Sequence, residues 1–182
     1  PVTGSTVLES IHHNVLNHVG RVSQRLCSDE HLAALFELQY EMEPNLVAMI
    51  DWWLSNTAYV YPENGIRLAF QALAKVAQYS HRPREGIDQL AILASKINQA
   101  LPLSSTGAHA KLLVASLYKQ TDSLKESLAW SHSALDDFKS IDEGSGEAWA
   151  LKTIGDARFR LSEHGLGHSR PLAMRDSASA SM

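Results

Sequence analysis

A helical periodicity runs through almost the whole chain and limits the folds that it can adopt. Between Ser5 and Glu163, apolar residues recur with a period of about 3.6, not 2, in nearly every window. The strongest run typical of a strand spans residues 57–61, is only five residues long and leads directly into Pro62. Such a run favours a connector over a sheet strand. The pattern therefore predicts an all-α protein.

Proline and polar residues divide this pattern into seven or eight helices. Proline is tolerated in the first turn of a helix, and Ser, Thr and Asp cap helix starts. The predicted helices run from about Ser5 to Leu26, from Ser28 to about Tyr40, from Pro44 to Leu54, from Pro62, from Pro83, after Ser104–Thr106, after Thr121–Asp122, and, beyond a turn at Asp142–Gly146, from Glu147 to Leu161.

Length and composition favour a single globular domain without membrane or nucleic-acid contacts. The chain has 182 residues, of which 45% are hydrophobic and 20% charged, and its formal charge is -4. The chain has no excess of basic residues with which to bind the phosphate backbone of a nucleic acid. No apolar run approaches the roughly 20 residues of a membrane span. The single cysteine, Cys27, fits a reducing compartment, and the N-terminal sequence lacks a secretory signal. We therefore expect a soluble, cytoplasmic protein.

A faint internal repeat joins the later helices. A large apolar residue precedes a small one at Ala74, Ala115 and Gly155, which are 41 and 40 residues apart. A small residue returns about a dozen positions later, as Gly86 and Ser127. Small side chains at such positions allow two helix backbones to approach closely. We therefore expect stacked helix pairs, with tight contacts at Ala115 and Gly155.

Three short stretches carry a family pattern: Asn45–Ala48 with Trp52, Gly65–Ala69 with Arg84–Gly86, and Gly146–Leu151 with Ile154–Gly155. They resemble tetratricopeptide (TPR) repeats, most of all those that follow the winged-helix part of STAND regulatory ATPases. AfsR-like, LuxR/MalT-like and NB-ARC proteins are examples of these regulators. The resemblance implies an all-α, right-handed superhelical array of antiparallel helix pairs, and it covers about residues 10–163.

The resemblance also suggests how the chain is organised. Residues 1–60 would form an N-terminal helical segment that leads into TPR-like repeats at 61–164. Residues 165–182 lack apolar periodicity and are expected to form a disordered tail. The chain contains no G-x-x-x-x-G-K-[ST] motif. The nucleotide-binding domain of such a regulator would therefore lie outside this chain.

No group of residues has the spacing of a catalytic or metal site. His12, His13 and His18 lack the i, i+4 pairing that places two imidazoles on one helical face, and the chain has no H-E-x-x-H motif. The acids at 136–137 and 142–143 are sequence neighbours and point in different directions on a helix. Cys27 follows Arg25, but no base for a nucleophile is evident. The sequence therefore predicts neither an enzyme nor a metal or cofactor site.

Protein–protein interaction is the function that these features favour, with the chain serving as a regulatory module of a larger signalling protein. The first helices of successive repeats would form a concave surface for a partner or peptide. Two alternatives remain open: a helical small-ligand-binding protein or enzyme with a pocket between helices, and an oligomerising fragment. The residues expected on the concave surface are Gln71, Lys75, Gln78, Tyr79, His109, Ser116, Lys119, Gln120, Lys152, Asp156 and Arg160.

The last predicted helix is a candidate for self-association. It carries Trp149, Leu151, Ile154, Phe159 and Leu161, and no second helix is predicted to cover it. An open end of a repeat array exposes the apolar face that the next repeat would bury. We expect self-association through this end, unless the charged residues of the helix turn outward and make it a cap.

Overall fold

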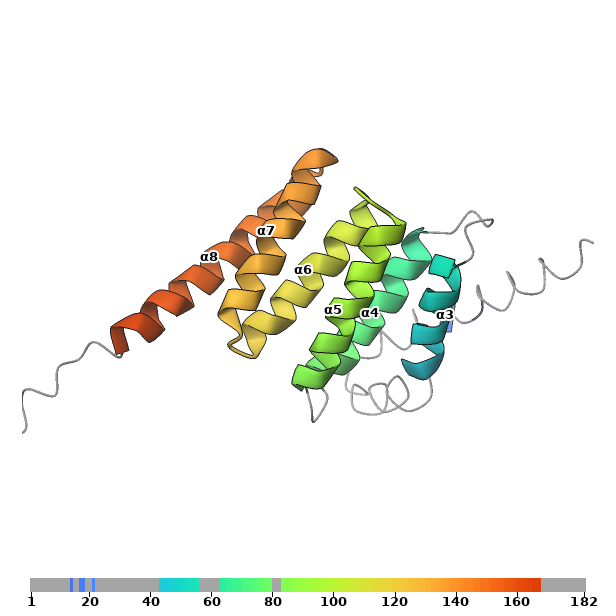
Figure 1. The fold of residues 1–182 in the computed structure, drawn as a ribbon, viewed down its shortest axis with the longest axis horizontal. Coiled ribbons are helices and arrows are strands. Elements are labelled where there is room, and N and C mark those ends of the chain that lie inside the picture. Colours follow the sequence, from blue (N-terminus) through green and yellow to red (C-terminus); the bar gives the residue numbers. More distant parts are fainter. Residues whose placement is uncertain are drawn as a thin grey trace, which may run out of the picture.

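The computed structural model describes residues 43–55, 63–79 and 83–167, together with four helical positions, Asn14, Asn17, His18 and Arg21. Every regular element in these residues is an α-helix (Figure 1), which confirms the all-α class. The helices are α3 (Glu43–Ser55), α4 (Glu63–Tyr79), α5 (Pro83–Ala100), α6 (Ser105–Gln120), α7 (Leu124–Ser140) and α8 (Gly144–Gly167).

Proline marks the starts of three helices as predicted. The observed starts at Glu43, Glu63 and Pro83 lie within one residue of Pro44, Pro62 and Pro83. Several other predictions fall outside the described residues. These are most of the helix at Ser5–Leu26, the helix at Ser28–Tyr40, the connector at 57–61, Cys27, and the tail from residue 168 onward.

The six helices that the structure describes pack in chain order, each against the next (Figure 1). Alternate helices also touch: α4 packs against α6, and α6 against α8. By contrast, the backbones of α5 and α7 do not pack together, and these two helices meet through an ion pair between Arg84 and Glu126. Because α4, α6 and α8 are in contact in this order, they form a continuous helical surface on one side of the array.

Two hydrophobic clusters form the core, and α6 belongs to both. The larger cluster joins α3, α4, α5 and α6 and includes the fully buried side chains of Trp53 and Phe70. The smaller cluster joins α6, α7 and α8 around Phe138. A salt bridge of 2.6 Å between Lys111 and Asp137, both largely buried, further ties α6 to α7. The array is therefore continuous from α3 to α8 through α6.

Two matching turns reverse the chain on either side of α7. Asp122 and Asp142 both adopt a φ of 56°, a left-handed conformation that Asp tolerates better than most residues. In each turn, the next N–H donates to a carbonyl five residues back: Ser123 to Tyr118 at 2.9 Å, and Glu143 to Phe138 at 3.0 Å. This is the hydrogen bond of a Schellman cap, which ends one helix and directs the chain into the next.

The start of α8 differs from the prediction. The sequence predicted a turn at Asp142–Gly146 and a helix from Glu147, whereas α8 already begins at Gly144. The turn at Asp142 completes the reversal alone, so the following glycines belong to the helix. At Gly146, a Cβ atom would lie 2.2 Å from ring carbons of Phe138. Glycine is therefore required there for the first turn of α8 to pack against α7.

The end of α8 also differs, because the helix continues to Gly167. It therefore includes the first three residues of the predicted disordered tail. No residue near Leu161 repeats the left-handed aspartate of the earlier turns, and the next proline is Pro171. Nothing in the described sequence after Leu161 forces a reversal of the kind seen at Asp122 and Asp142.

The small residues of the repeat behave as predicted at three positions and differently at a fourth. Ala115 is fully buried, and its carbonyl accepts a hydrogen bond of 2.8 Å from the Ser127 hydroxyl of α7. A Cβ atom on Gly86 would lie 3.2 Å from the Cβ of Ala77, so α4 and α5 also approach closely. The prediction for Gly155 is wrong: it is exposed, and no atom lies within 4 Å of its Cβ position. The described residues contain no helix that packs on this side of α8.

Candidate functional site

A groove of about 460 Å³ runs over the surface that α4, α6 and α8 form together. Each of the three helices contributes side chains to it, so the groove depends on how alternate helices pack. Five residues predicted for the concave surface line this groove. They are Gln71, Lys75, Gln78, Ser116 and Gln120.

The polar side chains of the groove are mostly free to bind. Within the described part of the chain, Gln71, Lys75, Gln78 and Gln120 make no side-chain hydrogen bond or ion pair. The exception is the Ser116 hydroxyl, which donates to the Leu112 carbonyl of its own helix at 3.0 Å. Three amides and one ammonium group therefore face the groove with their hydrogen-bonding capacity unused.

Apolar side chains complete the groove. Leu68 of α4 is 43% exposed and Trp149 of α8 is 39% exposed, whereas Leu113 of α6 is half-buried. Together with Leu117 of α6, these residues give the groove large apolar side chains from all three helices. Apolar surface beside a few unpaired polar groups is typical of ligand and peptide sites.

Three other predicted residues pair with one another. Lys119 of α6 contacts Asp156 of α8 at 2.8 Å, and Arg160 donates to the Lys119 carbonyl at 2.7 Å. The hydrogen bond from Lys119 holds the pKa of Asp156 below its ordinary value. Together with Gln120, these residues line an open depression at the C-terminal end of α6. The contacts of Lys119 with Asp156 and Arg160 connect α6 to α8.

His109 lies inside the array. Its ring stands edge-on to Phe138, with centroids 5.0 Å apart, and 6.2 Å from the ring of Trp149. Its Nδ1 is 2.9 Å from the Ser105 carbonyl and its Nε2 is 3.7 Å from Glu143. These contacts give His109 a packing role between α6, α7 and α8.

Tyr79 and Lys152, the last two predicted residues, lie apart from the groove. Tyr79 is 53% exposed at the end of α4, and Lys152 is exposed on α8. Neither lines the groove nor the depression beside Lys119. The structure thus brings together five of the predicted residues in the groove and places the others around it.

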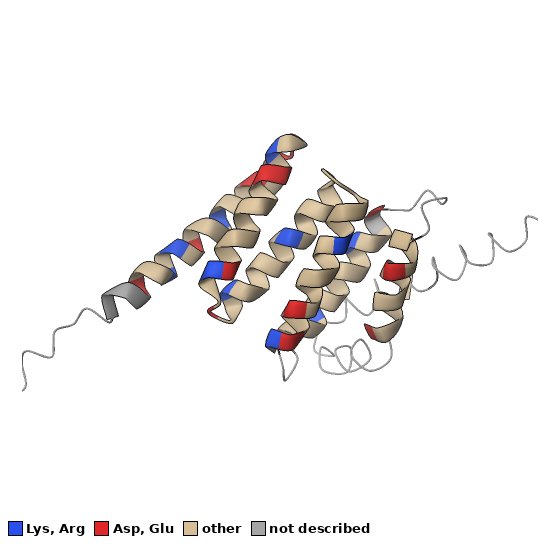
Figure 2. Ribbon diagram, viewed as in Figure 1, with Lys and Arg blue, Asp and Glu red and all other residues tan. Residues whose placement is uncertain are grey.

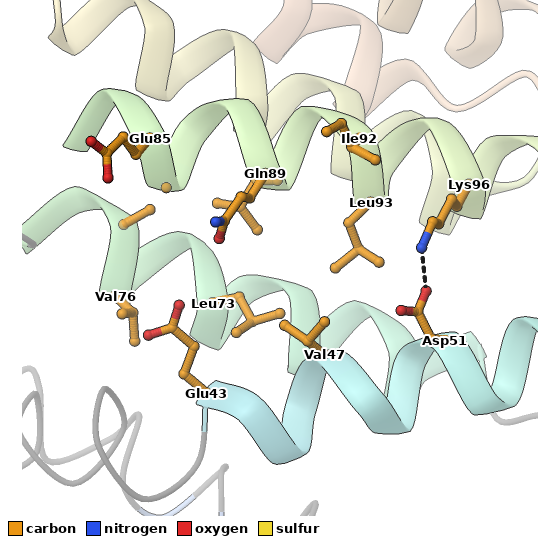
Figure 3. A pocket seen from close by; sticks show the side chains of 13 residues that line it. Glu43, Val47, Asp51, Leu73, Val76, Glu85, Gln89, Ile92, Leu93 and Lys96 are labelled. Carbon is orange, nitrogen blue, oxygen red and sulfur yellow. Dashed lines mark hydrogen bonds and ion pairs between the residues drawn. The ribbon is translucent and has the colours of Figure 1, made fainter. Parts of the chain in front are cut away.

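A second cavity, of about 470 Å³, lies between α3, α4 and α5 (Figure 3). Glu43, Glu85 and Gln89 line it together with apolar residues, and Lys96 pairs with Asp51 at 2.8 Å along it. Burial raises the pKa of Glu43 above its ordinary value. No pattern in the sequence predicts this cavity, because its lining comes from three helices without a shared motif.

An ionic and aromatic network fixes the helices behind the groove. The Tyr118 hydroxyl of α6 donates to Asp88 of α5 at 2.7 Å, and Arg84 lies 5.1 Å above the Tyr118 ring. Arg84 also pairs with Glu126 of α7 at 3.3 Å. These contacts hold α5, α6 and α7 in one arrangement at this end of the array.

Charges of both signs are distributed over the helices (Figure 2). Among the residues that the structure describes, no three His, Cys, Asp or Glu side chains are grouped as metal ligands. None of the helices in that part of the chain is long and apolar enough to cross a membrane. A search of protein families, curated proteins and solved structures found no match to this chain.

Proposed function

We propose that this chain is a protein-interaction module that binds a peptide segment of a partner in the groove of α4, α6 and α8. One observation carries the proposal. Four polar side chains of the groove have no partner within the described residues, and they lie beside exposed Leu68 and Trp149. Unused hydrogen-bonding groups next to exposed apolar surface suit a polypeptide, which offers both kinds of group.

The architecture proposed for this module is a TPR-like array in which α4, α6 and α8 are the first helices of successive pairs. The contacts between alternate helices support it, as do the spacings of 41 and 40 residues in the sequence. The groove then occupies the concave side, where helical repeat proteins bind their partners. In this proposal, the module belongs to a larger regulator similar to the STAND proteins, and it acts in the cytoplasm.

The groove chemistry indicates which peptides should bind. Glutamine amides can donate to and accept from a peptide backbone, so Gln71, Gln78 and Gln120 suit an extended segment. Lys75 would pair with a carboxylate of the peptide. Leu68 and Trp149 would contact an apolar side chain. The expected ligand is therefore an acidic segment with at least one large apolar residue.

A peptide-display selection on the full chain tests the proposal. The selected peptides should contain acidic and apolar residues, and Lys75→Glu should weaken their binding about tenfold or more, as measured by fluorescence anisotropy. The matched control is Lys125→Glu, which makes the same charge change at an exposed position on α7. Equal losses in both variants, or selected peptides that bind Lys75→Glu normally, would show that the groove is not the binding site.

A further inference from the structure

One face of α8 is left without a partner in the described structure. The opposite face is buried against α6 and α7 through residues such as Ala150 and Ala157. On one side, Asp156 bonds Lys119 of α6, and on the other, Arg158 lies 3.4 Å from His132 of α7. Among the other exposed positions of α8, five lie on the side of the helix opposite its buried residues. We call them the outer face of α8: Ala148, Leu151, Gly155, Phe159 and Ser162.

The corresponding positions of α6 indicate what kind of element this face of α8 would contact. Ala108, Lys111 and Ala115 of α6 are all buried on the side facing α7. One repeat later, 40 residues on, α8 carries Ala148, Leu151 and Gly155 at exposed positions. The part of the outer face formed by Ala148, Leu151 and Gly155 is therefore equivalent to the surface of α6 that α7 covers, and it suits a further antiparallel helix. Phe159 continues this face toward the depression beside Lys119.

The outer face also has the composition of a helix–helix contact. Leu151 is 54% exposed and Phe159 is 63% exposed, and both are large enough to bury substantial apolar area. Between them, the backbone at Gly155 is open, since no atom lies within 4 Å of its Cβ position. A glycine at the centre of such a face lets a second helix approach closely.

We propose that a second copy of this chain covers the face, through antiparallel packing of the two α8 helices centred on Gly155. The face is self-complementary about that residue. Leu151 and Phe159 are each four positions from Gly155, and Ala148 and Ser162 are each seven. An antiparallel pair therefore places Leu151 of one copy against Phe159 of the other, and Ala148 against Ser162, in an isologous contact.

Charges beside the outer face support the same arrangement. Lys152 and Glu163 lie along one edge of the face, and Glu147 and Arg158 along the other. In the antiparallel pair, each edge meets the same edge of the second copy in reversed direction. Lys152 then approaches Glu163 of the second copy, and Arg158 approaches Glu147. Antiparallel helices also align their dipoles favourably.

Sedimentation equilibrium of the full chain tests the dimer. One helix face buries less than the roughly 1,200 Å² of a standard interface, so dimers should form between about 10 and 500 µM protein. Phe159→Asp should remain monomeric throughout this range. The matched control is Ile92→Asp on α5, because Ile92 is 62% exposed and lies away from α8. A monomeric wild-type chain, or equal loss of dimer in both variants, would overturn the proposal.

Disulfide trapping tests the antiparallel register. In a Cys27→Ser background, Leu151→Cys and Phe159→Cys chains are mixed and oxidised with copper phenanthroline. The mixed 151–159 dimer should form several-fold faster than either homodimer. Ala129→Cys, at an exposed position on α7, is the control and should crosslink slowly. Faster formation of the 151–151 and 159–159 homodimers would overturn the antiparallel arrangement, as would equal rates for all pairs including the control.

Discussion

Two serines on the buried side of α7 show how much a single hydroxyl depends on its partner. Ser127 and Ser131 are both fully buried and lie one helical turn apart. The hydroxyl of Ser127 donates to the Ala115 carbonyl of α6 at 2.8 Å. Within the described residues, the hydroxyl of Ser131 has no hydrogen-bond partner. A buried hydroxyl with no partner loses its hydration without compensation.

Removing these two hydroxyls should therefore have opposite effects. Ser127→Ala should lower the free energy of unfolding by about 1 kcal/mol, because it removes a buried hydrogen bond between α6 and α7. Ser131→Ala should leave the free energy unchanged or raise it by up to about 1 kcal/mol, because it removes an unsatisfied group. Urea unfolding followed by circular dichroism measures both. A loss at Ser131 equal to that at Ser127 would contradict this interpretation.

Single residues were predictable where a local pattern determined their environment. The repeat spacing correctly identified Ala115 as a tight contact, and Gly86 as a close approach. The same spacing placed His109 on the concave surface, where the structure instead packs it against Phe138 and Trp149. Those rings come from two other helices, so their positions depend on how α7 and α8 pack. The periodicity of α6 alone carries no such information.

At the scale of a helix, two glycines of α8 have different requirements. A Cβ atom on Gly146 would lie 2.2 Å from the Phe138 ring, whereas one on Gly155 would meet no atom within 4 Å. Both residues lie in a helix with negative φ, so alanine would be tolerated by the backbone at either position. Only packing against α7 distinguishes the two sites.

Alanine substitution at these glycines should separate packing from helix propensity. Gly146→Ala should lower the free energy of unfolding by about 1–3 kcal/mol through overpacking against Phe138. Gly155→Ala should raise it by up to about 1 kcal/mol, because alanine favours the helix and meets no obstacle. Thermal unfolding near 1 µM protein, below the range expected for dimers, provides the measurement. Stabilisation by both substitutions would show that α8 does not pack closely at Gly146.

Most helix boundaries were predictable because proline and polar caps mark them in the sequence. The starts near Pro44, Pro62 and Pro83 are examples. The ends of α8 were not predictable in the same way. At its start, Gly146 belongs to a stretch that indicates a turn but instead provides space for Phe138. At its end, glycines lie within the helix as far as Gly167. Glycine permits both outcomes, and tertiary packing decides between them.

For the molecule as a whole, the helical pattern of the sequence predicts the all-α class and the order of the helices, but it does not predict the details of the groove. Predicted residues such as Gln71 and Ser116 meet because α4 packs against α6. The lining of the groove also includes Trp149, which comes from α8 and which the sequence assigned to a self-association surface. The second cavity, beside Glu43, combines three helices whose relative positions no periodicity specifies.

Tyr118 of α6 is linked to α5 through Asp88 and Arg84, and it should make the stability of the array depend on alkaline pH. Burial, followed by the hydrogen bond to Asp88, raises the pKa of Tyr118 to about 12, from an ordinary value of 10.0. Between pH 10 and 12, the unfolded chain releases this proton while the folded chain retains it. The unfolded state then binds fewer protons, so the free energy of unfolding contributed by Tyr118 falls as pH rises.

The variant Tyr118→Phe isolates this effect, because it lacks the titrating hydroxyl and keeps the ring under Arg84. At pH 8, the wild-type chain should be more stable than the variant by about 1 kcal/mol, the typical contribution of one hydrogen bond. Above pH 10, the gap should narrow and close before pH 12, as measured by urea midpoints at each pH. The other groups that titrate in this pH range are present in both proteins. Their contributions therefore cancel in the difference between the two free energies of unfolding. A constant gap from pH 8 to 12 would show that the Tyr118 hydroxyl does not hold its proton more tightly in the folded array.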